Sequence, residues 1–386
     1  MPHLKFVVFY NFVPRNRPGN LGGNCIVLMQ LRVKTDRTPD QRKNLIAVMK
    51  KIIISLILCA LLGNLTTRAQ DPNFSQFFAS PMTLNPALTG KFDGLYRFAA
   101  NYRNQWPSIN NAYTTMTASL DMSILKNSIP EFDQFGVGFM AYSDKAGDGA
   151  LNSTYYALSI AYHKALDENG YHQIGAGFQG TYMNKRLNTG KLTFQDQLTP
   201  MGFTGVTQES FSSNQVNLNY VDVNAGIMYN GSSNGYNNFY LGASMYHINR
   251  PKESFQEGNF LLNSRVTLQA GARIPVGIYN SLHLAGNHSM QANAHNTMIG
   301  GAFSLNVNNN EENPTNFYLG SWYRFGDALI PYMGLEFGEW HFGASYDVNT
   351  SALKAASNSR GGVEISLIYI RRHTDQNMKK LNCPKF

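Results

Sequence analysis

Long stretches in which apolar and polar residues alternate one by one constrain the fold of this chain more than any other feature. From position 96 to 103 the even positions are apolar or aromatic, and the odd positions are mostly polar. The same period returns at positions 114–121, 173–182, 266–274, 341–348 and 363–369. A period of two with one apolar and one polar face predicts β-strands that have different surroundings on their two sides.

Two architectures have such strands: a water-soluble sheet over a dry core, and a transmembrane barrel with lipid outside and a polar lumen. The alternating segments run for about ten to fourteen residues, which is closer to the roughly 9–11 of a tilted membrane strand than to the roughly 5–6 of an ordinary one. Aromatic residues also gather at the segment ends, as in the interfacial girdles of membrane barrels. Both observations favour the transmembrane barrel.

Fourteen segments can be placed along the chain. They are 95–103, 113–121, 134–143, 152–163, 171–184, 216–230, 236–247, 264–275, 279–290, 296–307, 315–325, 329–338, 339–348 and 360–370. The longest connections, 185–215, 248–263 and 349–359, all follow odd-numbered segments, as external loops do. We therefore predict an all-β fold: a closed, antiparallel transmembrane β-barrel of about 14 strands over residues 95–370, with both termini periplasmic and a short periplasmic tail at 371–386.

Residues 49–69 have the features of a secretory signal peptide. A basic start at Met49-Lys50-Lys51 precedes an apolar run at 52–62, and small residues precede a cleavage position between Ala69 and Gln70. The apolar run is too short for a membrane anchor, which needs about 20 residues. Residues 1–48 show no helical or strand period and are interpreted as an upstream extension from a mis-assigned start codon.

The basic balance of the whole chain, +8, is concentrated in these leading segments. They hold 11 of the 32 Lys and Arg residues and 2 of the 24 acidic residues, so the part from Gln70 onward is close to neutral. Nucleic acid is therefore not expected as a partner. Only Cys383 follows the predicted cleavage position, which excludes an intramolecular disulfide framework or a cysteine-rich metal site in that part.

The segment 70–94, before the first predicted strand, is rich in proline and aromatic residues. It suits neither a membrane strand nor a flexible tail, and it is expected at the periplasmic mouth of the barrel as a plug, a lid or a docking peptide. Inside the barrel, charged residues are predicted on or near the polar faces of the strands, and paired or solvated structural charges are favoured over an ion or solute path. These residues are Arg97, Arg103, Asp121, Arg273, Arg324, Glu336, Asp347 and Glu364.

Three blocks carry a resemblance to a known family. The blocks are Asp71-Pro72-Asn73-Phe74-Ser75-Gln76, then Asn85-Pro86-Ala87 with Thr89-Gly90, then Asn101-Tyr102-Arg103-Asn104-Gln105-Trp106-Pro107. They resemble the start of the PorP/SprF family, which comprises outer-membrane proteins of the type IX secretion system. The C-terminal part is similar to the family as well, with Ser345–Asn349, Gly361–Leu367 and the closing Cys383-Pro384-Lys385-Phe386.

The resemblance implies a role in the outer membrane that the alternation pattern cannot show. It implies that the protein supports export or surface attachment of proteins with a C-terminal sorting domain, including gliding adhesins. It further implies that the protein works with periplasmic and outer-membrane components of the secretion system. It also implies that the shared N-terminal blocks are a partner-binding surface. The residues concerned are Asp71, Pro72, Phe74, Ser75, Gln76, Asn85, Pro86, Asn101, Tyr102, Arg103, Gln105 and Trp106.

Other chemistry receives little support from the sequence. His283, His288 and His295 do not have the spacing of a compact zinc site, and 144–149 lacks the ligand pattern of an EF-hand and is interpreted as an external turn. No cofactor or metal is expected. A lipid hydrolase would need a nucleophile motif, and no GxSxG pattern occurs. A passive diffusion channel shares every argument for the barrel, and is the stronger alternative to a secretion component.

Overall fold

The computed structural model describes residues 71–109, 112–125, 128–203, 205–210, 215–255, 258–310 and 314–372. All of them belong to one compact unit, Arg68–Phe386. The predicted upstream extension, signal peptide and cleavage position lie outside the described residues, and so does most of the predicted C-terminal tail. In the described part, no helix has both the length and the apolar character needed to cross a bilayer.

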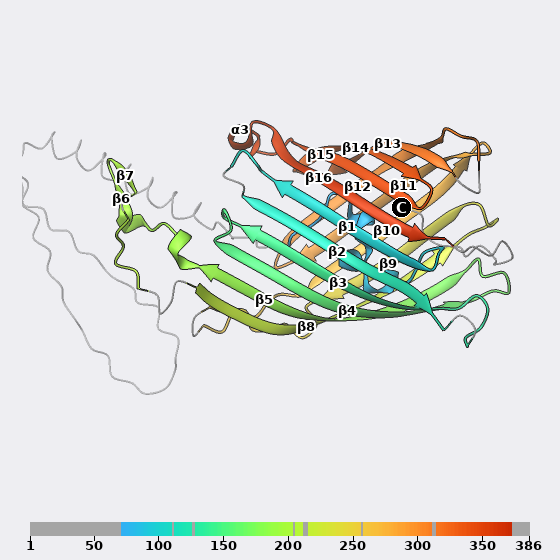
Figure 1. The fold of residues 1–386 in the computed structure, drawn as a ribbon, viewed down its shortest axis with the longest axis horizontal. Coiled ribbons are helices and arrows are strands. Elements are labelled where there is room, and N and C mark those ends of the chain that lie inside the picture. The colour runs from blue at the N-terminus through green and yellow to red at the C-terminus, as the bar shows by residue number, and fades with distance from the viewer. Residues whose placement is uncertain are drawn as a thin grey trace, which may run out of the picture. The chain divides into compact units, whose positions relative to one another are not determined.

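Fourteen antiparallel strands form a closed barrel (Figure 1). The first seven are β1 (Tyr96–Gln105), β2 (Tyr113–Ile124), β3 (Gln134–Ala146), β4 (Leu151–Ala165), β5 (Gln173–Asn188), β8 (Gln215–Gly231) and β9 (Asn238–Tyr246). The other seven are β10 (Arg265–Val276), β11 (Asn280–Gln291), β12 (Ala294–Asn306), β13 (Thr315–Arg324), β14 (Ala328–Phe337), β15 (Trp340–Asn349) and β16 (Arg360–Arg371). Each pairs with its neighbours in the chain, and β1 closes on β16.

The predicted barrel fold is confirmed. Each of the fourteen predicted segments overlaps one barrel strand, and their boundaries differ by four residues at most. On β2 the even positions, such as Met116 and Leu120, face outward and are exposed, whereas Thr117 and Asp121 face inward and are buried. Because closure gives every strand two partners, no strand edge is left with unpaired amide groups in lipid.

The two ends of the barrel differ in their connections. One end, here called the loop end, carries the long connections β5–β8, β9–β10 and β15–β16; the other, the turn end, carries the start of β1 and the end of β16. The β5–β8 connection was predicted as a loop without strands. It contains a short hairpin formed by β6 (Leu198–Thr199) and β7 (Gly202–Phe203), as well as the 3-10 turns η3 (Thr189–Lys191) and η4 (Gln195–Gln197). The β15–β16 connection carries α3 (Lys354–Ser357).

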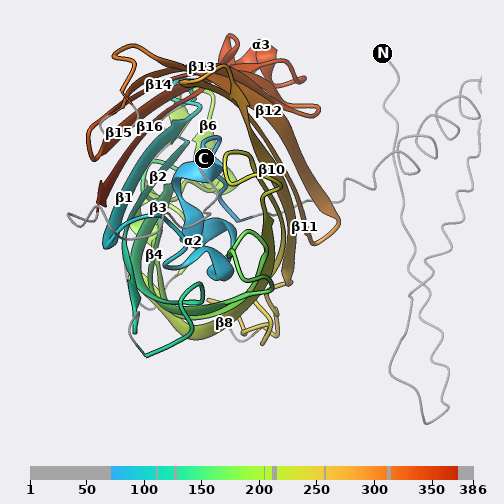
Figure 2. The ribbon, with the colours of Figure 1, turned by 90° about the vertical axis from the view of Figure 1, so that its right-hand side faces the viewer.

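The barrel is not empty. Residues 71–92 lie within it and form three short turns, η1 (Phe77–Ala79), α2 (Pro81–Leu84) and η2 (Pro86–Leu88), seen inside the ring of strands in Figure 2. Prolines at the start of α2 and η2 favour the beginning of a helical turn, and Asn85 caps η2 by accepting a hydrogen bond from the Ala87 amide at 2.8 Å. We call residues 71–92 the lumen segment.

Candidate functional site

The lumen segment runs through the barrel from the loop end to the turn end. Asp71 contacts Arg265 and Gln291, which are the loop-end residues of β10 and β11. Lys91, at the other end of the segment, contacts Gln134 and Gln173, the turn-end residues of β3 and β5. The segment is therefore not confined to the mouth where the sequence places it, and the described chain begins at the loop end of the lumen.

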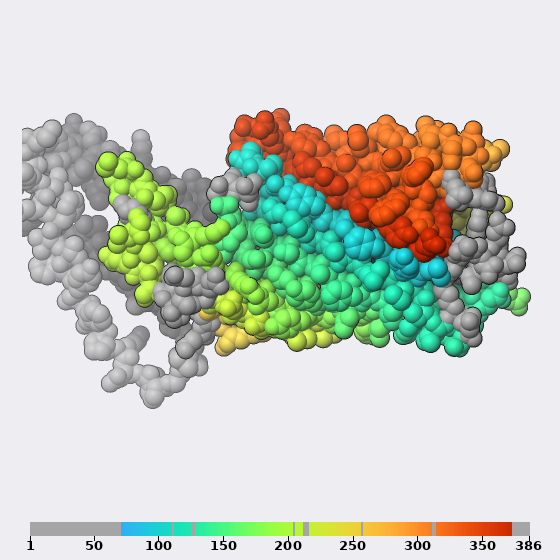
Figure 3. Space-filling view, viewed as in Figure 1, coloured from blue at the N-terminus to red at the C-terminus, as the bar shows by residue number. Residues whose placement is uncertain are grey.

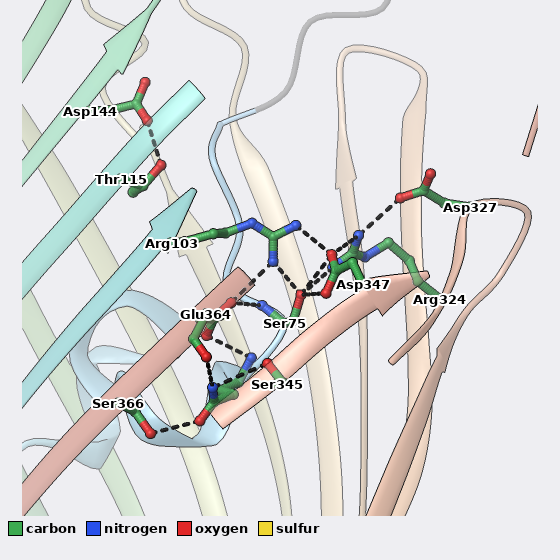
Figure 4. A network of polar contacts seen from close by, with 11 residues as sticks. Ser75, Arg103, Thr115, Asp144, Arg324, Asp327, Ser345, Asp347, Glu364 and Ser366 are labelled. Carbon is green, nitrogen blue, oxygen red and sulfur yellow. Dashed lines mark hydrogen bonds and ion pairs between the residues drawn. The ribbon is translucent and has the colours of Figure 1, made fainter. Parts of the chain in front are cut away.

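A network of buried charges holds the first part of the segment (Figure 4). The backbone amides of Ser75 and Gln76 donate to the two carboxylate oxygens of Glu364 on β16, at 2.7 and 2.9 Å. The Gln76 amide group donates to the Glu364 carbonyl at 3.0 Å and accepts from the Ser366 hydroxyl at 2.6 Å. Glu364 thus accepts the hydrogen bonds that the Ser75 and Gln76 amides would otherwise form with backbone carbonyls.

Arg103 connects this network to two strands. Its guanidinium pairs with Asp347 on β15 at 2.7 Å and with Glu364 at 3.1 Å, and it also donates to the Ser75 hydroxyl. Arg324 on β13 approaches from the other side, 3.0 Å from Asp347 and 2.6 Å from Ser75. Two arginines and the Asp347 carboxylate therefore surround the Ser75 hydroxyl, and each buried charge of the network has an opposite partner.

A second cluster holds the beginning of the segment at the loop end. The imidazole of His247, which follows β9, lies between Asp71 at 2.7 Å and Asp222 at 2.9 Å. Burial lowers the pKa of His247, but the two carboxylates outweigh this effect and raise the pKa to about 9. Burial raises the pKa of Asp71, whereas His247 and Arg265 lower it, and the net result is a pKa well below its usual value. At neutral pH this contact is therefore an ion pair.

The turn end of the lumen has its own charged contacts. Asp121 on β2 pairs with Arg97 on β1 at 2.7 Å and accepts from the Gly90 amide at 2.7 Å. Arg97 also donates to the Leu88 carbonyl at 3.0 Å. The buried Lys91 ammonium donates to Gln134 at 2.8 Å. Arg97 and Asp121 thus pair along the wall and also bind the lumen segment.

Apolar packing joins the segment to the opposite wall. The ring of Phe78 lies 5.0 Å from Trp322 on β13 and 5.4 Å from Tyr332 on β14, and all three side chains are buried. Met82, which is fully buried, packs with Met140 and Ala157 on the other side. A lumen with an apolar core and a polar surround is a packed interior rather than a water-filled channel.

Glycines on the inner wall let the segment approach closely. A Cβ at Gly177 on β5 would lie 2.4 Å from the carbonyl carbon of Pro86, and a Cβ at Gly226 on β8 would lie 1.9 Å from the Asn85 side chain. The Asn85 amide in turn donates to the Ile227 carbonyl at 3.1 Å. These positions need glycine because the backbone and cap of η2 lie directly against the strands.

The predicted partner-binding residues fall into two groups. Asp71, Ser75, Gln76, Asn85 and Arg103 form the inward network described above. With them belong Phe74, which is buried and lies 6.4 Å from Tyr142, and Pro86 of η2, also buried; Pro72 is partly buried. Asn101 faces inward on β1 and is buried, but neither polar atom of its side chain has a hydrogen-bond partner among the described residues.

The remaining three residues lie elsewhere. Tyr102 faces outward on β1 and is exposed. Gln105 is the last residue of β1, opposite Gly362. Trp106 follows it with φ of +54°, and its ring lies 5.6 Å from Tyr113, the first residue of β2. The structure therefore does not unite the twelve residues into one surface.

The other sequence candidates are also placed. His283 faces inward, whereas His288 and His295 stack on the outer face of β11 and β12 at 5.8 Å. Among the described residues no group of three potential ligands is arranged to hold a metal ion. The interpretation of 144–149 as an external turn needs correction: β3 extends to Ala146, and Asp144 faces the lumen, where it accepts from Thr115 at 2.6 Å.

Sequence reasoning missed several residues of the site. His247, Arg265 and Gln291 contact Asp71, and Asp222 holds His247 from its other side, yet all four lie more than 150 positions from Asp71 along the chain. The wall aromatics around Phe78 were missed for the same reason. The only signal in the sequence for three of these residues is an inward position on an alternating strand: Asp222, Arg265 and Gln291. His247 lies outside any strand and therefore has no such signal.

The fold of this chain is similar to that of solved membrane barrels. A Pseudomonas aeruginosa FadL homologue matches with a TM-score of 0.39 and 10% identity, covering 74% of this chain and 92% of that chain. A deletion mutant of the TodX monoaromatic hydrocarbon channel matches with a TM-score of 0.45 and 9% identity, over 75% and 93%. At such identities the likeness is one of fold alone. No curated protein matches the sequence.

A family model described as type IX secretion system membrane protein PorP/SprF matches residues 66–369. The match includes the lumen segment and nearly all of the barrel, so it joins the two parts that the structure shows to be packed together. It agrees with a closed barrel whose apolar outer wall belongs in the outer membrane. The chain belongs to the PorP/SprF family of type IX secretion system membrane proteins.

Proposed function

We propose that this protein is an accessory barrel of the type IX secretion system that supports export or surface attachment of proteins with a C-terminal sorting domain. The supporting observation is the occupied lumen: the lumen segment, which carries the family-like blocks at 71–76 and 85–90, is fastened along its length by buried ion pairs, hydrogen bonds and aromatic contacts. A barrel filled in this way is suited to present a surface to a partner.

On this proposal residues 70–94 act as a plug, the loop end faces the cell exterior and receives the exported protein, and the turns and the C-terminal tail face periplasmic components of the system. Both long loops beside β5 and β9 lie at the loop end. The described chain also begins on that side, because Asp71 contacts His247 and Arg265 at the loop end, whereas the sequence predicts this segment and both termini on the periplasmic side.

A passive diffusion channel is the second candidate, because the fold itself is shared with barrels of that kind. Against it stands the packed apolar core around Phe78 and Met82, because a porin has a polar, water-filled lumen. Purified protein in planar bilayers should therefore be electrically silent. Steady conductance of the intact protein would favour the channel.

The experiment that tests the secretion role compares cell-surface and culture-medium proteomes with and without this gene. Loss of one or a few sorting-domain proteins from the surface, with unchanged levels of other outer-membrane barrels, is the expected result. An unchanged surface together with reduced uptake of small solutes would overturn the proposal. Complementation with the Trp106→Ala variant then tests whether the loop end of β1 takes part in retaining the exported protein.

A further inference from the structure

A shallow groove of about 530 Å³ lies on the outer wall of the barrel, across β16, β1, β2, β3 and β4. Its floor is a row of alanines, because Ala100 stands opposite Ala118 and Ala118 opposite Ala141. Tyr102 and Met116, both exposed, rise beside this row on its loop-end side. The wall that contains the groove faces the viewer in Figure 3. Since the outward side of these strands faces lipid, the groove can receive acyl chains.

Two cations lie on the same outward face, nearer the loop end. Lys145 stands opposite Asn152, and Asn152 stands opposite Arg186, so the three side chains form a row across β3, β4 and β5. Lys145 and Arg186 are exposed. The row is one outward position closer to the loop end than Ser143 and Thr154, which line the groove.

Neither cation has an acidic partner in the described part of the chain. None of the ion pairs there involves Lys145 or Arg186. Asp144, the preceding residue, faces the lumen and is held by Thr115. Arg186 donates to Asn184 at 2.8 Å, which orients its guanidinium along the outer face. Two cations without acidic partners at the edge of the lipid belt favour an anionic head group.

Amide oxygens beside the cations add a further requirement. The side-chain oxygens of Asn104 and Asn152 are buried and accept no hydrogen bond from the described residues. Both residues belong to the outward row that contains Lys145, because Asn104 stands opposite Thr114 and Thr114 opposite Lys145. Amide side chains beside two cations suit a head group that carries hydroxyls or amides as well as phosphate.

We propose that this surface, formed by the alanine groove together with Lys145, Asn152 and Arg186, binds a phosphorylated, multiply acylated glycolipid of the outer leaflet, namely the lipid A part of lipopolysaccharide. The acyl chains occupy the groove, the phosphates contact Lys145 and Arg186, and the sugar groups lie beside Asn104 and Asn152. The assignment to the outer leaflet rests on the proposed orientation in which the loop end faces the cell exterior. It does not depend on which protein is exported.

Native mass spectrometry of the delipidated full-length barrel tests this proposal, with bisphosphorylated lipid A, dephosphorylated lipid A and phosphatidylglycerol as separate probes. Bisphosphorylated lipid A should bind the wild type best. The double variant Lys145→Ala/Arg186→Ala should bind it about thirtyfold more weakly, since each cation contributes about 1 kcal/mol to such a contact. Lys164→Ala is the matched control, because Lys164 is an exposed lysine near the turn end of β4.

A second variant keeps the test independent of charge. Ala118→Trp fills the floor of the groove from an outward position and should weaken binding of bisphosphorylated lipid A while both cations remain. Heat-modifiable migration on gels verifies that each variant forms a folded barrel. Unchanged lipid A binding in the double variant, or equal binding of phosphatidylglycerol by the wild type, would overturn the proposal. A surface proteome that does not change on loss of this gene would overturn the secretion role alone, because lipid A binding is measured on the purified barrel.

Discussion

The Ser75 hydroxyl donates a hydrogen bond of 2.7 Å to the carboxylate of Asp347, although the two residues stand 272 positions apart in the sequence. This contact joins the lumen segment to β15, and Arg103 and Arg324 bind the same carboxylate from β1 and β13. The first residues of the segment are therefore held by strands from both ends of the chain. The contacts of Ser75 with Arg103 on β1 and Glu364 on β16 lie at the strand pair that closes the barrel.

Arg103→Ala should destabilise the barrel strongly, because it leaves the carboxylates of Asp347 and Glu364 buried with one cation fewer. Breaking a buried ion pair from one side lowers the free energy of unfolding by about 3–5 kcal/mol. Urea unfolding in detergent, followed by tryptophan fluorescence, measures the change. Arg186→Ala, an exposed arginine on β5, is the control and should stay within about 0.5 kcal/mol of the wild type. Equal stability of the two variants would show that the network does not fasten the segment.

Gly177→Ala should destabilise the protein by about 1–3 kcal/mol, because the new methyl group would overlap the backbone of η2 and force the segment away from β5. Gly180→Ala lies on the same strand, where a Cβ meets nothing within 4 Å, and should be tolerated. Thermal unfolding of the two purified variants gives the comparison. If both variants melt together with the wild type, the segment does not press against this wall in the membrane.

The loop-end contact of Asp71 should weaken in alkali. The pKa of His247 is raised to about 9 by Asp71 and Asp222, so the positive imidazole stabilises the folded protein fully below the unfolded pKa of about 6.5. This contribution declines as pH rises from there and is lost once pH passes about 9. Thermal unfolding between pH 6 and 10 should show the loss.

His247→Gln is the matched variant for this pH series. It retains hydrogen-bonding groups but cannot titrate, so its stability should change less over the same range than that of the wild type. Asp71→Asn should likewise reduce the pH dependence, because the main charge that raises the pKa is removed. A wild-type curve that is flat between pH 6 and 10 would contradict the ion pair.

Trp106→Ala should reduce retention of the exported partner at the cell surface and leave barrel assembly intact. Trp106 lies at the loop end of β1, and its main described contact is the ring of Tyr113, so little of the barrel depends on it. Surface proteomics and heat-modifiable migration measure the two effects. Trp340→Ala, which removes an exposed aromatic residue at the turn end, is the control for loss of an interfacial tryptophan. Normal retention in Trp106→Ala would exclude this residue from the docking surface.

The sequence by itself determined the barrel and the direction of its side chains. On a strand each residue faces the side opposite to its neighbours, so the alternation of Tyr102 with Arg103 is enough to send one to lipid and the other to the lumen. The even count of long segments and the grouping of long loops followed from the same period. The family-like blocks were also readable, because they are local in the chain.

Only the tertiary structure decided what fills the lumen and which charges meet. The lumen segment has no period of its own, and its partners lie on strands brought together by closure of the barrel. Thus Ser75 meets Asp347, Asp71 meets His247 and Phe78 meets Trp322. Whether a proline-rich segment stays at the mouth or enters the barrel depends on inner-wall glycines and buried countercharges contributed from across the chain, and local sequence patterns do not record such long-range packing.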